Sequence, residues 1–154
     1  MEWTGAVHAE IFAELGAKDC DIIVRVSDVY PDGRSMLIAD CHRRASFRAG
    51  LNLPPTLLEP GDRCKVVFRV GWMSQNFNAG HRIRVTVSCT GLPLYETGGN
   101  GLDDSAGRST HSVLHGAAQP SCVLAPVIPS GSQADCVDMS EMMMADLEAG
   151  VFPA

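Results

Sequence analysis

Short segments in which apolar and polar residues alternate run through most of the first 129 residues of this chain. The first of them, residues 6–15, has an apolar side chain at every second position. This period of two is expected when one face of a β-sheet is buried. A second segment, residues 21–30, is rich in β-branched residues, and Pro31-Asp32-Gly33-Arg34 after it is typical of a tight turn. The pattern predicts strands from the start of the chain, with a hairpin around this turn.

Further strand segments follow, and stretches rich in glycine or proline separate them. Residues 50–62 and 96–108 have the composition of connections and lack apolar periodicity. The predicted strands after the turn are residues 35–47, 64–70, 83–89, 110–114 and 122–127. About seven strands without an intervening helical pattern predict an all-β sandwich or barrel.

The last 25 residues differ from the rest, because they carry five acidic residues and no basic one. Asp138 and Glu141 have the spacing of a helix capping box. The apolar residues after Asp138 share one face at helical spacing, which predicts a short amphipathic helix. They are Met139, Met142, Met143 and Leu147. We therefore divide the chain into a body, residues 1–129, and an acidic methionine-rich tail, residues 130–154, whose helix docks on the body or, alternatively, on a partner.

Charge and hydropathy exclude several classes of partner. The body has 12 Lys and Arg against 13 Asp and Glu, with no basic stripe to neutralise phosphates, so we expect no nucleic-acid partner. No segment approaches the roughly 18 apolar residues of a membrane span. Glu2 and Glu10 interrupt the region where a signal peptide would be basic and then apolar. We expect a cytoplasmic protein without a membrane partner.

Six cysteines are scattered along the sequence, and none forms a CxxC pair. Neither a zinc knuckle nor a thioredoxin-type motif is therefore predicted. Most of them lie in apolar runs, which favours buried thiols in a reducing compartment. A disulfide is the alternative, but the sequence does not indicate which cysteines would pair. The six cysteines are Cys20, Cys41, Cys64, Cys89, Cys122 and Cys136.

Motifs for catalysis or cofactor binding are weak throughout. The GxSxG elbow of α/β-hydrolases does not occur, and its nearest fragment, residues 33–37, lies at a predicted hairpin. His111 and His115 share a strand face and could approach a metal, but a third ligand is not evident. Surface or hydrogen-bonded histidines without a metal are therefore favoured. Asp103 and Asp104 fall far short of a calcium pattern. We predict no catalytic residue, no metal and no cofactor.

Aromatic and amide side chains between residues 71 and 81 suggest a contact with a ligand. Trp72 could stack on a sugar near Asn76, although an aromatic cap over the core is the commoner role. The residues that we consider for contact with a ligand or partner are Trp72, Asn76, His111, His115, Met139, Met142, Met143 and Leu147.

A set of motifs in a fixed order resembles the C-terminal domain of the X-Pro dipeptidyl-peptidase and cocaine-esterase-like hydrolases. The motifs are DVYPDGR at 28–34, FRAG at 47–50, LLEPGD at 57–62, the run from Asn76 to Val85, Pro120-Ser121, and LAPVIP at 124–129. The resemblance implies a jelly-roll, galactose-binding-like β-sandwich that packs on an α/β-hydrolase domain. In that family the catalytic Ser, Asp and His belong to the hydrolase domain, so no catalytic residue is carried over here.

The chain also departs from the family pattern. We expect the family's opening strand to be missing or reduced to residues 1–3, and the hydrolase domain to be absent. A missing strand would leave an unpaired edge, which a second copy or the tail could cover. The leading hypothesis is a non-catalytic accessory module whose partner is a separate hydrolase domain or a second copy of the chain. The alternatives are a carbohydrate- or small-ligand-binding sandwich and a hydrolase with an unrecognised site.

Overall fold

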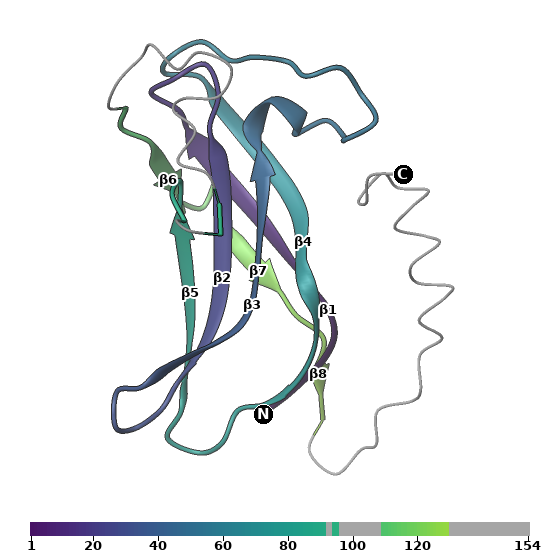
Figure 1. Ribbon diagram of the computed structural model, residues 1–154, viewed down its shortest axis with the longest axis vertical. Helices are drawn as coiled ribbons and strands as arrows, with labels where there is room; N and C mark the ends of the chain where they lie inside the picture. Colours follow the sequence, from purple (N-terminus) through teal and green to yellow (C-terminus); the bar gives the residue numbers. More distant parts are fainter. Residues whose placement is uncertain (92–93, 96–108, 130–154) are drawn as a thin grey trace.

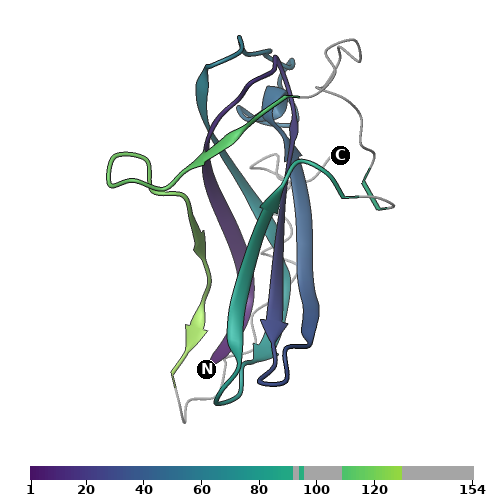
Figure 2. The same cartoon turned by 90° about the vertical axis from the view of Figure 1, so that its left-hand side faces the viewer.

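The computed structural model describes residues 1–91, 94–95 and 109–129, and these residues form two antiparallel sheets. Figure 1 shows the sheets as two layers, and Figure 2 shows them edge-on. The elements are β1 (Glu2–Glu14), β2 (Asp21–Val29), β3 (Ser35–Arg44), the 3-10 helix η1 (Ala45–Phe47), β4 (Arg63–Asn76), β5 (Arg82–Ser88), β6 (Ser112–Leu114), β7 (Cys122–Leu124) and β8 (Val127–Ile128). The predicted all-β sandwich is confirmed.

The first sheet is built around β1. Strand β4 pairs with β1 along its whole length, and the short strands β6, β7 and β8 pair with its other side. Residues Val7, Ala9, Ile11 and Ala13 are buried, so the alternation predicted from the sequence does mark the inward face. The outward face of β1 and β4 carries charged side chains. Among them is an ion pair in which Nζ of Lys65 lies 2.6 Å from Oε2 of Glu10.

The second sheet has the order β3-β2-β5. The predicted hairpin joins β2 to β3, and the Tyr30 amide donates a hydrogen bond to the Arg34 carbonyl at 2.9 Å. Gly33 has a φ of 91°, which explains the need for glycine at this turn. Strand β2 lies between two neighbours and is buried on both faces, because Ile23 as well as Val24 is inaccessible to solvent.

The core lies between the two sheets. Its members include Ile11 from β1, Val24 from β2 and Phe68 from β4. At the end of the sandwich where β1 begins, Trp3 closes the core against Phe77, with the ring centroids 5.2 Å apart.

Two expectations about the strands need correction. Strand β1 begins at Glu2 rather than at residue 6, and β4 continues to Asn76 rather than ending at residue 70. The two extensions pair with each other, and a bulge between Val7 and His8 keeps the strands in register past Gly71. Strand β1 has neighbours on both sides, and the described edge strands are β4 in its own sheet and β3 and β5 in the other.

The tail prediction cannot be followed in the fold, because residues 130–154 lie outside the described residues, as do Asp103 and Asp104. Among the described residues no helix is long and apolar enough to cross a bilayer.

Candidate functional site

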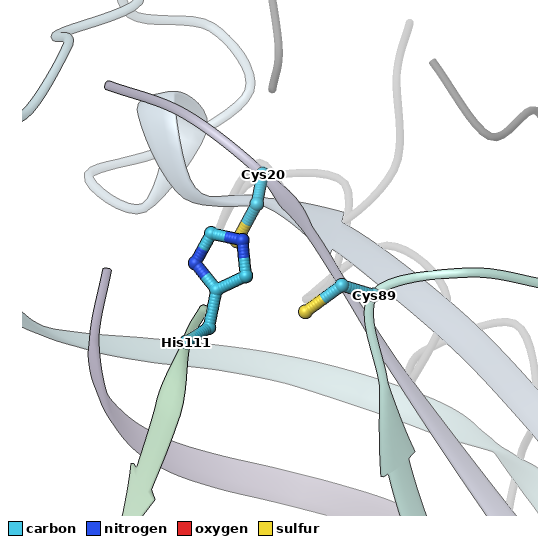
Figure 3. Close-up of side chains that lie close together, drawn as sticks. All are labelled: Cys20, Cys89 and His111. Carbon is cyan, nitrogen blue, oxygen red and sulfur yellow. The ribbon is translucent and has the colours of Figure 1, made fainter. Parts of the chain in front are cut away.

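Three chemically reactive side chains meet at the end of the sandwich where β2 begins. Cys20 immediately precedes β2, Cys89 immediately follows β5, and His111 immediately precedes β6. Their two sulfurs and one imidazole nitrogen all lie within 4.8 Å of one another. Figure 3 shows the three side chains converging from three separate segments. We call these three residues the thiol–imidazole cluster.

The two thiols of the cluster are linked electrostatically. A hydrogen bond with Cys89, together with burial, raises the pKa of the Cys20 thiol far above its ordinary value. The same hydrogen bond lowers the pKa of Cys89. The two thiols therefore affect each other's protonation, as expected for sulfurs this close together.

The imidazole of the cluster has one hydrogen bond that fixes its position. The hydroxyl of Ser109 lies 2.8 Å from Nε2 of His111. Nδ1 of the same ring is buried and has no hydrogen-bond partner among the described residues. Burial lowers the pKa of His111, which favours the neutral ring that can bind a ligand through a nitrogen lone pair.

A second polar group lies at the opposite end of β2. Nδ1 of His81 is 2.9 Å from both carboxylate oxygens of Asp28, and the ring of Tyr30 stacks on the imidazole with 4.3 Å between centroids. His81 also borders a surface hollow of about 480 Å³. The other residues that line this hollow are Met1, Phe77, Asn78, Ala79 and Ile83.

These two groups resemble the two halves of a Ser-His-Asp triad, but they are not assembled. Ser109 and His111 form the hydroxyl–imidazole half, and Asp28 and His81 form the carboxylate–imidazole half. A strand as long as β2 separates them by about 25 Å, at about 3.3 Å per residue. In a Ser-His-Asp triad one imidazole contacts both the nucleophile and the carboxylate. In the described part of the chain, therefore, neither half has the geometry of a serine hydrolase.

The described residues that were predicted to contact a ligand lie in different parts of the fold. Trp72 is half-buried on β4, and the guanidinium of Arg69 covers one face of its ring at 5.1 Å from the centroid. Asn76 is exposed at the end of β4, and His115 is exposed just after β6. Of these residues only His111 takes part in a cluster, and its neighbours there are cysteines rather than His115. Met139, Met142, Met143 and Leu147 lie outside the described residues.

The sequence did not single out Cys20 and Cys89 as a pair, nor Asp28 and His81. The cysteines are far apart in the sequence, and they approach only because β5 pairs with β2. One signal was available: each cluster residue stands directly beside the end of a strand segment. Side chains at strand ends meet when those ends lie on the same side of a sandwich, but strand order was needed to show it.

Comparison with known families gives one match, to the X-Pro dipeptidyl-peptidase C-terminal non-catalytic domain, over residues 1–124. Cocaine esterase from Rhodococcus sp. (strain MB1 Bresler) is 33% identical over 136 residues. The aligned region covers 83% of this chain and 23% of the esterase, so the chain spans about a quarter of that relative's length.

Solved structures share the fold at lower identity. An aminopeptidase from the marine sediment archaeon Thaumarchaeota archaeon superposes with a TM-score of 0.74 at 22% identity, covering 83% of this chain and 24% of that one. A CocE/NonD family hydrolase from Staphylococcus aureus gives a TM-score of 0.69 at 12% identity, covering 83% of this chain and 28% of that one. In each case the similarity is confined to a sandwich that makes up a minor part of the larger chain.

Proposed function

Since the chain belongs to the family of X-Pro dipeptidyl-peptidase C-terminal non-catalytic domains, we propose that it is an accessory module that packs on an α/β-hydrolase domain and helps to shape that domain's substrate cleft. The family match over residues 1–124 is the observation that carries the proposal. The separation of the Ser–His and Asp–His pairs supports a role without catalysis. The proposal is the same whether the hydrolase domain lies on this polypeptide or on another.

The exposed part of the outer face of the β3-β2-β5 sheet, around Leu37, is the surface that we propose for this packing, since Gly91 already lies against Ile23 and Arg25 farther along the same face. Leu37 on β3 lies opposite Ser27 and is 51% exposed. Ser27 follows the core residue Val26 on β2, so Ser27 and Leu37 face away from the core. Exposed apolar side chains on a sheet face are typical of contacts with another domain. Ion pairs do not distinguish the two outer faces, since Glu10–Lys65 lies on the other sheet and Arg25–Asp40 and Arg44–Asp21 lie on this one.

A chimaera tests this function. The region of cocaine esterase that is similar to this chain is replaced by this chain, and ester hydrolysis is compared with that of the esterase truncated before the replaced region. We expect the chimaera to be active and the truncated enzyme to be inactive. Leu37→Asp in the chimaera should reduce activity at least about tenfold, because a charge would be buried in the contact.

The matched control for Leu37→Asp is Val67→Asp. Val67 lies on β4 between the core residues Val66 and Phe68, and is 46% exposed on the opposite outer face. This variant should leave the activity of the chimaera unchanged. Equal activity of the truncated enzyme and the chimaera would contradict the accessory role, and equal effects of the two variants would contradict the choice of face.

The catalytic alternative has its own test. The chain alone should neither hydrolyse esters nor take up a serine-directed fluorophosphonate label, as followed by mass spectrometry, with intact cocaine esterase as the positive control. Stoichiometric labelling with turnover would show that the chain is a hydrolase in its own right.

The remaining parts of the proposal concern ligand, partner and location. A galactose-binding-like role would use Trp72, but Arg69 covers one face of its ring, which weakens support for sugar stacking. We propose a hydrolase domain rather than a homodimer as the partner, because the relatives in the family match carry such a domain, and a second copy stays an alternative. A reducing, cytoplasmic location is supported by the free thiols of Cys20 and Cys89, which stand near each other without a disulfide.

A further inference from the structure

We propose that the thiol–imidazole cluster, formed by Cys20, Cys89 and His111, binds one zinc ion that links the two sheets of the sandwich. Thiolate sulfur and imidazole nitrogen are the donors that zinc prefers in proteins. All three donor atoms already lie within 4.8 Å of one another. The accessory function described above does not use these residues, so this site is independent of it.

The spacing of the donors is close to that of a zinc site. With Zn–S bonds of about 2.3 Å, two sulfurs of a tetrahedral site lie about 3.8 Å apart. The donor atoms here need to approach by no more than about 1 Å, which side-chain rotation can supply without moving the strands. Figure 3 shows that the side chains are directed toward a common space rather than into separate parts of the core.

The backbone holds these side chains at fixed places. Cys20 and Cys89 stand at the ends of β2 and β5, and these two strands are paired from Ile23 with Ser88 to Val29 with Arg82. His111 stands at the start of β6, which pairs with β1 in the other sheet. An ion held by all three would therefore connect the sheets at an end where, in the described residues, β6 is only three residues long.

The donor set favours zinc over other common metals. Two sulfurs and a nitrogen disfavour magnesium and calcium, which take oxygen ligands. Three protein ligands leave the fourth position of a tetrahedral ion to a water molecule. The alternatives to a zinc site are that Cys20 and Cys89 are buried free thiols or that they form a disulfide. The experiments below distinguish both alternatives from zinc binding.

The first experiment measures zinc binding by the full, reduced chain in competition with a chromogenic chelator. We expect one zinc per chain and a rise in melting temperature on loading, because an ion bound only by the folded state stabilises it. Cobalt in place of zinc should give the visible absorption of a tetrahedral site together with a thiolate charge-transfer band. Cys89→Ser and His111→Gln should each weaken binding by at least about 100-fold.

Matched controls separate this site from adventitious binding. Cys122→Ser removes an exposed thiol on β7, and His115→Gln removes an exposed imidazole four positions from His111. Both should bind zinc as tightly as the parent chain. Circular dichroism on each variant confirms that the fold is kept, and Cys89 and His111 are preferred to the more deeply buried Cys20 for this reason.

Three results would overturn the proposal. The first is the absence of stoichiometric zinc binding by the reduced chain. The second is binding that Cys89→Ser and His111→Gln leave intact, or that Cys122→Ser and His115→Gln abolish equally. The third is a Cys20–Cys89 disulfide, found by non-reducing peptide mapping, in protein purified under conditions that preserve the cellular redox state.

Discussion

At the scale of single residues, the contact between His81 and Asp28 shows how much one buried polar pair depends on the strands around it. The two side chains are 53 positions apart in sequence, and they are only 9% and 2% exposed. Both carboxylate oxygens lie 2.9 Å from Nδ1 of the imidazole. In such an enclosed position neither group can replace its partner with water.

Asp28→Asn tests how much this pair contributes to the stability of the fold. The carboxylate accepts a charge-assisted hydrogen bond that an amide can only partly replace, so we expect unfolding free energy to fall by about 2 kcal/mol. Urea denaturation followed by tryptophan fluorescence measures the change. Asp32→Asn is the control, because Asp32 forms an exposed ion pair with Arg34 in the adjacent turn and should have little effect. Equal losses for the two variants would show that the buried pair has no special role.

The sequence could indicate the residue types at the sites but not their partners. His111 was considered for a metal because of its spacing from His115, yet the structure places Cys20 and Cys89 beside it. Spacing along a strand determines which side chains share a face, whereas contacts between segments depend on strand order. Trp72 illustrates the same limit, since Arg69 covers its ring from three positions away on the same strand.

At the scale of elements, the connection between β1 and β2 must pass very close to the segment that leads into β6. A Cβ atom at Gly16 would overlap the carbonyl oxygen of Thr110, which immediately precedes His111. Glycine is required here by close approach of two backbones and not by an unusual φ angle. The same contact helps to position the histidine of the thiol–imidazole cluster.

Gly16→Ala should therefore disturb both the fold and the cluster. Because backbone rather than a flexible side chain must move, we expect a loss of about 2 kcal/mol in unfolding free energy. Differential scanning calorimetry measures the loss. The control is Gly116→Ala, since a Cβ at Gly116 meets nothing within 4 Å, and its stability should be nearly unchanged. A fully stable Gly16→Ala variant would mean that this connection adapts easily.

Alternation along the sequence predicted the strands well, but their ends poorly. Residues 71–76 contain glycine, serine and amide side chains and lie beyond the predicted strand 64–70, and yet they continue β4. They stay in the strand because residues 2–6 of β1 lie opposite and supply hydrogen bonds, while the bulge between Val7 and His8 absorbs the irregularity. Pairing with a distant partner thus outweighed local propensity.

At the scale of the whole molecule, each described sheet has an inner strand that is paired on both sides and outer strands that are paired on one side. The first strand is paired on both sides, and the core residues from Trp3 to Phe77 are shared between the two sheets. The outer strands β4 and β5 carry exposed basic side chains, among them Lys65, Arg82 and Arg84. Charged side chains on edge strands disfavour pairing with another copy of the chain. We therefore expect β4 and β5 not to pair with another copy of the chain.

Removal of residues 130–154 tests whether the body is a self-sufficient unit, as the division at residue 129 predicts. The described core residues, from Trp3 to Ala125, all precede the cut. We expect the shortened chain to unfold in a single cooperative transition, with unfolding free energy within about 1 kcal/mol of that of the full chain. Light scattering should give the mass of a monomer for both chains, because the basic outer strands are unchanged by the cut. A dimer that forms only with the tail would show that the tail is an association element, and a loss of cooperative unfolding would show that it completes the core.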